Sequence, residues 1–270
     1  MNKKEEFKNS LFVRVFRLIK LNKKLFFLTL MFDILFIASL YFTSQLITLA
    51  LTPRIESIAR FFGLPVLVLL FALLFSIGYI CLLIWLYSFF KYNILDLIKS
   101  MKQKTESGFR RLKSFFLLNL IMLVVGFVSF FLIGLMFLGI KSQYLPIVYL
   151  IVIIPTVLTF YSFINFAHSY FVLKHLSVKG ALKHSLKRIS KLSSYYKIYL
   201  ITLGYILAYL AVYFLIALLM KNIVLDKYKL LGFLPIYVNV FTVITLIVFY
   251  FIIAYNRIYY YLIVEGEEQK

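Results

Sequence analysis

The chain has 270 residues, of which 63% are hydrophobic and 19% aromatic, and it carries a net charge of +20 at pH 7. A soluble globular domain is about 45–50% apolar, so a soluble core cannot hide this excess of apolar side chains. A single cysteine, Cys81, excludes an internal disulfide framework and a cysteine-based metal site. The composition therefore predicts an integral membrane protein.

Six long apolar runs follow one another along the chain. Each exceeds the roughly 20 residues that a helix needs to cross the hydrocarbon core of a bilayer. The runs are continuously apolar, whereas the strands of a membrane barrel alternate in polarity. The sequence predicts one all-α membrane domain with six transmembrane helices, at about residues 25–51, 61–90, 115–140, 144–173, 197–219 and 231–255.

The positive charge is divided unequally between the two ends of these runs. Of the 30 Lys and Arg residues, 24 lie before the first run, in the second and fourth gaps, or after the last run, and six lie in the other gaps. The positive-inside rule then predicts a multi-pass protein of the cell membrane with both termini in the cytoplasm. Because the charge lies in short juxtamembrane segments, we expect anionic lipid as its partner and no nucleic acid.

Three basic segments, at about residues 6–24, 96–113 and 177–194, each precede a pair of apolar runs. In the first and third, apolar residues at helical spacing form one face and basic residues another, as in helices that lie in the membrane interface. Ser177 is the expected N-cap of the third. The residues expected to contact lipid headgroups are Arg14, Arg17, Lys20, Lys179, Lys183, Lys187 and Lys191.

A short likeness between the first and third basic segments raises the question of internal repeats. Residues 8–11 read Lys-Asn-Ser-Leu, and residues 183–186 read Lys-His-Ser-Leu. Three matches in four positions leave open whether the three pairs of runs arose by duplication.

Polar residues inside the apolar runs are candidates for a functional site because they are unfavourable in hydrocarbon. Asp33 lies roughly 12 Å into the first run, from the 1.5 Å rise per helical residue. In the fourth run, Asn165, His168 and Ser169 share one helical face. These residues form either an intramembrane polar site, with His168 paired to Asp33, or hydrogen bonds that hold helices together. Pro155 is expected to kink the fourth helix.

Tyrosines mark the last two runs. Tyr205, Tyr209 and Tyr213 recur every four residues, which suits either an aromatic cavity or packing between helices with hydroxyl hydrogen bonds. Tyr255 and the tyrosines at 259–261 lie beside Arg257 near the end of the sixth run, where an aromatic belt at the membrane interface is expected.

Motifs of catalysis and cofactor binding are absent from the sequence. It contains no phosphate-binding Gly-x-x-x-x-Gly-Lys-Ser/Thr loop, no His-Glu-x-x-His and no Gly-x-Ser-x-Gly nucleophile elbow. With one acidic residue and one histidine in the predicted spans, the sequence favours a protein that is not an enzyme and that needs no cofactor or metal.

One stretch resembles a known group of membrane proteins. Residues 176–185 read Leu-Ser-Val-Lys-Gly-Ala-Leu-Lys-His-Ser between two apolar runs. This is similar to the linker in a broad set of prokaryotic multi-pass proteins, including the membrane domain attached to some glycerophosphodiester phosphodiesterases. The resemblance covers about a fifth of the chain. It implies an all-helical membrane domain and supplies no catalytic residues.

Two functions are compatible with these patterns. The favoured one is a non-enzymatic membrane protein that associates with anionic lipid and organises the membrane or recruits a partner. The alternative is a small-solute transporter, or the membrane subunit of one, that uses Asp33, His168 and Pro155 and binds a membrane or ATPase partner protein through its basic segments.

Overall fold

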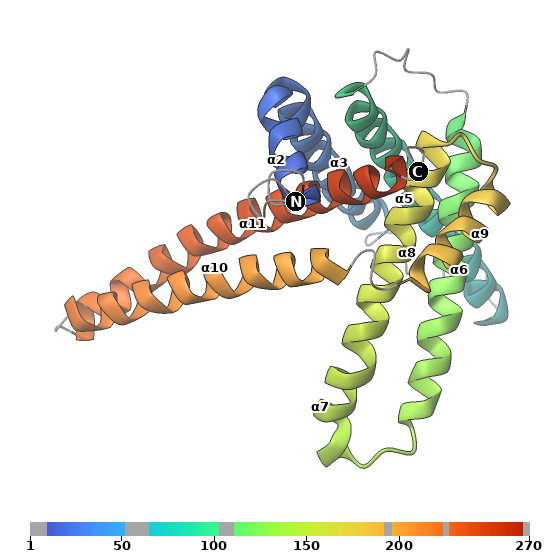
Figure 1. The fold of residues 1–270 in the computed structure, drawn as a ribbon. Helices are drawn as coiled ribbons and strands as arrows, with labels where there is room; N and C mark the ends of the chain where they lie inside the picture. Colours follow the sequence, from blue (N-terminus) through green and yellow to red (C-terminus); the bar gives the residue numbers. More distant parts are fainter. Residues whose placement is uncertain (1–9, 52–64, 103–110, 192–195, 224–226, 267–270) are drawn as a thin grey trace. The chain divides into compact units, whose positions relative to one another are not determined.

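The computed structural model describes residues 10–51, 65–102, 111–191, 196–223 and 227–266 (Figure 1). Every regular element in these ranges is a helix. Six of the described helices are long and apolar enough to cross a membrane, at Lys23–Leu49, Val66–Ser100, Leu112–Phe137, Ile151–Leu173, Tyr196–Ile216 and Val238–Glu265. The all-α, six-span prediction is confirmed. The parts of the predicted segments at residues 6–9, 61–64, 103–110 and 192–194 lie outside the described residues.

The helices form two compact groups, and the first comprises residues 22–186. It contains α3 (Lys23–Leu51), α5 (Pro65–Ser100), α6 (Leu112–Phe137) and α8 (Ile154–Leu173), and α5 contacts each of the other three. Aromatic rings fill the α3–α5 contact, with Phe36 and Tyr87 5.9 Å apart between ring centroids and Phe32 and Phe90 6.2 Å apart. The prediction that the six spans form one domain stays a prediction.

Helix α5 continues ten residues beyond the predicted end of its span. At 1.5 Å per residue its 36 residues measure about 54 Å, which exceeds the roughly 30 Å of a hydrocarbon core. Residues 96–100, which the sequence assigned to a separate amphipathic segment, are the last turns of this helix. Ile94, Leu95 and Ile98 are 1–2% exposed, so burial against protein holds these turns in the helix.

The fourth predicted span, at about 144–173, consists of several helical segments. A 3₁₀ turn (Ser142–Tyr144), α7 (Leu145–Val148) and a π-helical segment (Tyr149–Ile153) precede α8. Pro155 lies in the first turn of α8 and has no N–H for the carbonyl of Ile151. The wider π-helical turn relieves the clash of the proline ring with that carbonyl, so the predicted irregularity lies in the turn that precedes Pro155.

The second group comprises residues 1–21 and 187–270, of which residues 10–21, 187–191, 196–223 and 227–266 are described. It contains α2 (Leu11–Leu21), α10 (Tyr196–Ile223) and α11 (Lys227–Glu265). Tyr213 of α10 packs on Phe241 of α11 with ring centroids 5.1 Å apart, and the hydroxyls of Tyr209 and Thr245 hydrogen-bond. The interpretation of the α10 tyrosines as packing residues is confirmed.

The end of α11 differs from the sequence prediction. The sixth span was expected to end at about residue 255, with tyrosines in an interfacial belt, but the helix runs to Glu265. Tyr255, Tyr260 and Tyr261 are at most 1% exposed and belong to the protein core. Phe12 and Phe16 of α2 lie 5.9 and 5.3 Å from the ring of Tyr255, so a helix of the same chain covers residues that were assigned to lipid.

Candidate functional site

A directed chain of hydrogen bonds joins three helices of the first group. Nε2 of His168 in α8 lies 2.7 Å from Oδ1 of Asn119 in α6, and Nδ2 of Asn119 donates to Oγ of Ser88 in α5 at 2.9 Å. Ser88 donates in turn to the carbonyl of Ile84 at 2.6 Å. Because that donation leaves the Ser88 oxygen as an acceptor, Asn119 must direct its NH2 toward Ser88 and its carbonyl toward His168. His168 therefore carries its proton on Nε2.

Burial strengthens the hydrogen bonds that join Ser88, Asn119 and His168. His168 and Ser88 are fully buried and Asn119 is 6% exposed. Hydrogen bonds between buried polar groups in a low-dielectric setting are strong, and breaking one leaves a partner with its full desolvation penalty. The rings of Phe115 and Tyr87 pack on the imidazole at 4.8 and 6.2 Å, which keeps its orientation.

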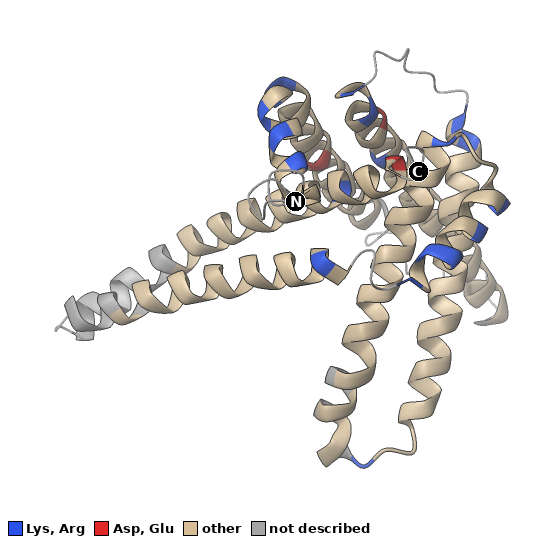
Figure 2. Cartoon of the chain, in the orientation of Figure 1, with Lys and Arg blue, Asp and Glu red and all other residues tan. Residues whose placement is uncertain are grey.

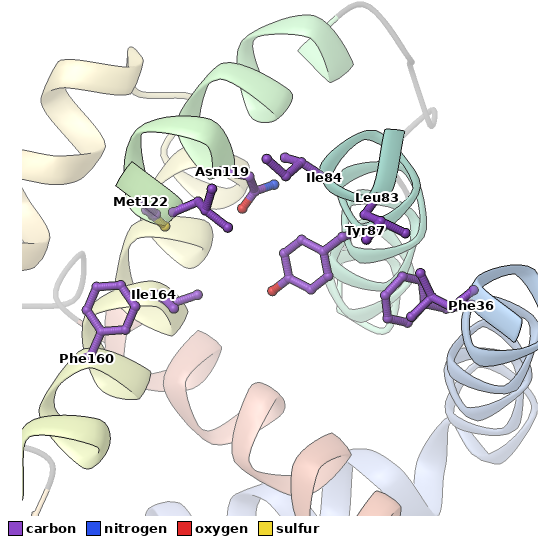
Figure 3. Close-up of a pocket in the computed structure, with 10 residues that line it drawn as sticks. Phe36, Leu83, Ile84, Tyr87, Asn119, Met122, Phe160 and Ile164 are labelled. Atoms are coloured by element: carbon purple, nitrogen blue, oxygen red, sulfur yellow. The ribbon is translucent and has the colours of Figure 1, made fainter. Parts of the chain in front are cut away.

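Asn119 also lines a cavity of about 370 Å³ between α3, α5, α6 and α8. Figure 3 shows the ring of Tyr87 projecting into it between Phe36 and Ile164. Apart from Asn119 and the Tyr87 hydroxyl, the wall is apolar. The lining residues are Phe36, Leu40, Leu83, Ile84, Tyr87, Asn119, Met122, Leu123, Phe160 and Ile164.

The polar residues predicted from the sequence are not among the residues that line this cavity, but two of them lie one helical turn from a lining residue. Asp33 is 4% exposed and lies one turn from the lining residue Phe36, and His168 lies one turn from Ile164. Asn165 and Ser169 are buried beside His168 on α8, and the Asn165 amide donates to the carbonyl of Tyr161 in its own helix. The pairing of Asp33 with His168 stays a prediction.

Neither Asn119 nor Ser88 was predicted from the sequence as a site residue. Each is a polar residue inside a largely apolar run, and an asparagine in a span is itself a signal of hydrogen bonding between helices. No lysine was predicted inside a span, whereas Lys91 and Lys99 are 6% and 7% exposed within the continuous helix α5.

A second polar cluster lies where α8 gives way to α9 (Val178–Ile189). Arg111 donates from Nη1 to the carbonyl of Phe171 at 3.0 Å and from Nη2 to the carbonyl of Leu176, and its guanidinium lies 4.1 Å above the Phe171 ring. Helix C-termini leave carbonyls without intrahelical partners and attract cations. Arg111, at the start of α6, thus fixes the end of α8.

His175 belongs to the same polar cluster, at the junction between α8 and α9. Its φ of 48° lies in the left-handed region that glycine usually occupies after a helix. Lys99 Nζ lies 3.0 Å from its Nε2, and Arg111 Nη1 lies 3.3 Å from its Nδ1. Partial burial, and then the positive charges of Lys99 and Arg111, lower the pKa of the His175 imidazole below its usual value. A neutral ring is therefore favoured between two cations.

Helix α9 carries basic residues along its length, drawn in blue in Figure 2. Its start is capped as predicted, since Oγ of Ser177 accepts from the N–H of Gly180 at 3.2 Å. The buried residues are small, with Ala181 and Ser185 fully covered, while Leu186 is 62% exposed. The side chains of Lys179, Lys183 and Lys187 are exposed.

Two predicted headgroup contacts differ in setting from the rest. Helix α9 ends at Ile189, so Lys191 is exposed beyond the helix and does not extend the lysine stripe. On α2, Arg17 and Lys20 are exposed and Arg14 is half-buried, because the neighbouring Val15 and Leu18 face the protein interior.

The likeness between residues 8–11 and 183–186 does not extend to their structural roles. Ser10 stands before α2, where its Oγ accepts from the N–H of Val13 at 3.4 Å. Ser185 lies inside α9, fully buried, and donates to the carbonyl of Ala181 at 2.6 Å. The matched serines therefore cap one helix and pack the middle of the other.

Comparisons with known proteins supply no relative: no family model matches the chain, and neither does any curated protein or solved structure. The resemblance to membrane domains of glycerophosphodiester phosphodiesterases stays a prediction. Among the described residues, no group of three His, Cys, Asp or Glu side chains is placed to hold a metal ion. The cavity, the polar clusters and the basic surfaces are therefore the features of the chain that bear on its function.

Proposed function

We propose that this chain is a non-enzymatic, multi-pass protein of the cell membrane that associates with anionic lipid and organises the membrane or recruits a partner protein. The observation that carries the proposal is the outward row of Lys179, Lys183 and Lys187 on α9, directly after a membrane-spanning helix. Each lysine close to an anionic membrane surface contributes about 1 kcal/mol of attraction.

The unequal charge division supports the orientation. The 24 Lys and Arg residues on one side of the spans include the α9 lysines, so both termini and α9 belong to the cytoplasmic side in this proposal. The exposed Leu186 on the same helix suits a position at the boundary between headgroups and acyl chains.

The proposal is tested by the lipid selectivity of the full chain in vesicles of phosphatidylcholine and phosphatidylglycerol. Spin-labelled phosphatidylglycerol reports how strongly the anionic lipid is enriched around the protein. The triple substitution K179Q/K183Q/K187Q should reduce that enrichment roughly tenfold or more, since three contacts of about 1 kcal/mol are weakened. Added salt should reduce the wild-type enrichment in the same direction.

Lys141→Gln is the matched control, because Lys141 is exposed and lies at the opposite ends of the spans. It should leave the enrichment unchanged. Equal enrichment for the triple variant and the wild-type chain would contradict the proposal.

A transporter, or the membrane subunit of one, is the second candidate. It is favoured by the π-helical interruption before Pro155, since broken helices mark the substrate sites of many transporters. Mass spectrometry of the intact protein in native-lipid particles separates the two candidates. A stoichiometric ATPase would support the transporter subunit, and a specific anionic lipid without a protein partner would support lipid association.

A further inference from the structure

The cavity next to Asn119 combines a hydrophobic wall with one polar end. Asn119 is 6% exposed, and its amide nitrogen carries two N–H groups, of which the bond to Ser88 uses one. The second can donate to an oxygen inside the cavity. An acceptor there would be held by an amide that His168 and Ser88 already orient from both sides.

The polar end lies close to the ends of α6 and α8 on the α9 side. Asn119 is seven residues from the start of α6 and His168 five residues from the end of α8, which places both about 8–11 Å along their helices from the α9 side. The interfacial layer on each side of the hydrocarbon core is roughly 5–8 Å thick. With these helix ends placed in that layer, Asn119 lies near the boundary between headgroups and acyl chains.

The rest of the cavity extends away from this boundary. Leu123 lies one turn deeper than Asn119 on α6, and Phe160 lies one turn deeper than Ile164 on α8. An elongated apolar molecule with its oxygen at Asn119 would thus direct its body toward the middle of the bilayer. That is the orientation of a lipid in the leaflet on the α9 side.

The cavity also reaches the outer surface of the helices. Leu123 lines it and is 47% exposed, beside Val124 at 53% and Phe127 at 71%. In a membrane, lipid acyl chains cover this apolar surface. One acyl chain can therefore enter the cavity from the side without crossing a polar barrier. A cavity of about 370 Å³ falls within the usual range of roughly 300–1,000 Å³ for ligand sites.

From this geometry we infer that the cavity binds one acyl chain of a membrane glycerolipid, whose ester carbonyl accepts a hydrogen bond from Nδ2 of Asn119. Tyr87 and Phe36, which line the cavity, contact the acyl chain. His168 acts as a positioning residue that fixes the orientation of the Asn119 amide. The site is independent of the headgroup contacts on α9 and goes beyond them.

The test uses the full chain in phosphatidylcholine vesicles that contain a trace of phosphatidylcholine with a diazirine in the middle of one acyl chain. After illumination, mass spectrometry locates the labelled residues. Met122 is 3% exposed and lines the cavity, whereas Val124 faces outward, so the ratio of label on these two residues separates bound from surrounding lipid. Substantial label on Met122 is expected in the wild-type chain.

Two substitutions at neighbouring positions provide a matched pair. Leu123→Trp should fill the cavity and lower the label on Met122 about tenfold, equivalent to the loss of about 1.4 kcal/mol of binding. Val124→Trp, on the same helix and outside the cavity, should leave that label unchanged. Asn119→Leu should lower the label from a diazirine placed next to the ester more than the label from one at mid-chain.

Three results would overturn the inference. One is label confined to outward residues such as Val124 in the wild-type chain, which indicates surrounding lipid only. Another is equal labelling of Met122 in the Leu123→Trp and Val124→Trp variants. The third is an equal fall in label from the two diazirine positions in the Asn119→Leu variant, which would leave the ester without a contact at Asn119. K179Q/K183Q/K187Q should leave the Met122 label unchanged, so failure of the headgroup proposal and failure of this one are distinguishable.

Discussion

Helices α2 and α9 have the same kind of sequence, but they differ in which side chains are buried by the rest of the protein. Both are short, basic and amphipathic, and both precede a membrane-spanning helix. Helix α2 buries large side chains, Val15 and Leu18, and contacts the tyrosine-rich end of α11. Helix α9 buries Ala181 and Ser185 and leaves Leu186 exposed.

This difference shows that an amphipathic pattern identifies an apolar face without identifying what covers it. The apolar face of α2 was expected to lie in the acyl boundary, but Phe12 and Phe16 contact Tyr255 of the same chain. On α9 the buried side chains are small, and the larger apolar side chain of Leu186 remains exposed. Helix α9 is therefore the better candidate for a membrane contact.

The largest expected effect comes from charging the buried face of α2. Val15→Asp places a carboxylate at a fully buried position, and an uncompensated buried charge destabilises a protein by about 3–5 kcal/mol. We expect a marked fall in the thermal unfolding temperature of the purified protein and faster proteolysis near the N-terminus. Arg17→Asp, on the exposed face, is the control and should leave both nearly unchanged.

If α2 rested in lipid and not on α11, Val15→Asp would release it from the membrane and leave the unfolding temperature of the remaining helices as in the wild-type protein. That result would mean that the apolar face of α2, like that of α9, is not covered by protein.

A smaller effect is expected from enlarging the buried face of α9. Ala181→Leu adds three heavy atoms at a fully covered position, and overpacking of this kind destabilises by about 1–3 kcal/mol. Thermal unfolding in detergent measures the change. Leu186→Ala removes an exposed side chain from the same helix and should alter stability by no more than about 0.5 kcal/mol. Equal effects of the two substitutions would mean that α9 is not docked through its small residues.

The smallest expected effect concerns the junction that precedes α9. Because the pKa of His175 is lowered in the folded protein, the unfolded chain binds more protons once the pH falls below the usual value of about 6.5. Stability should be fully retained above that pH and decline as the pH falls through the lowered pKa. The measurement is the thermal unfolding temperature between pH 7.5 and 5.

His175→Asn should flatten this decline, since asparagine tolerates the positive φ and does not titrate. His184→Asn, at an exposed position on α9, should preserve it. A decline that persists unchanged in His175→Asn would assign the pH dependence to another group.

Several features of the site were accessible from the sequence because they depend on neighbours along the chain. The cap at Ser177 follows from a hydroxyl three residues before the N–H that it accepts. The polar face of α8 follows from helical spacing, and Asn165, His168 and Ser169 are all buried as expected of residues inside a bundle. The partner of His168 was not accessible, since Asn119 lies 49 positions earlier on another helix.

The sequence by itself determined the helical class and the six spans, because crossing a bilayer depends on about 20 consecutive apolar residues and requires no distant partner. Only the tertiary structure decided which apolar and polar residues meet. It extended α5 and α11 beyond their predicted ends, brought Tyr255 under α2 and joined Asn119 to His168 beside a cavity. These outcomes depend on packing between residues far apart in the chain, where burial and hydrogen-bond geometry, and not local hydropathy, select the partners.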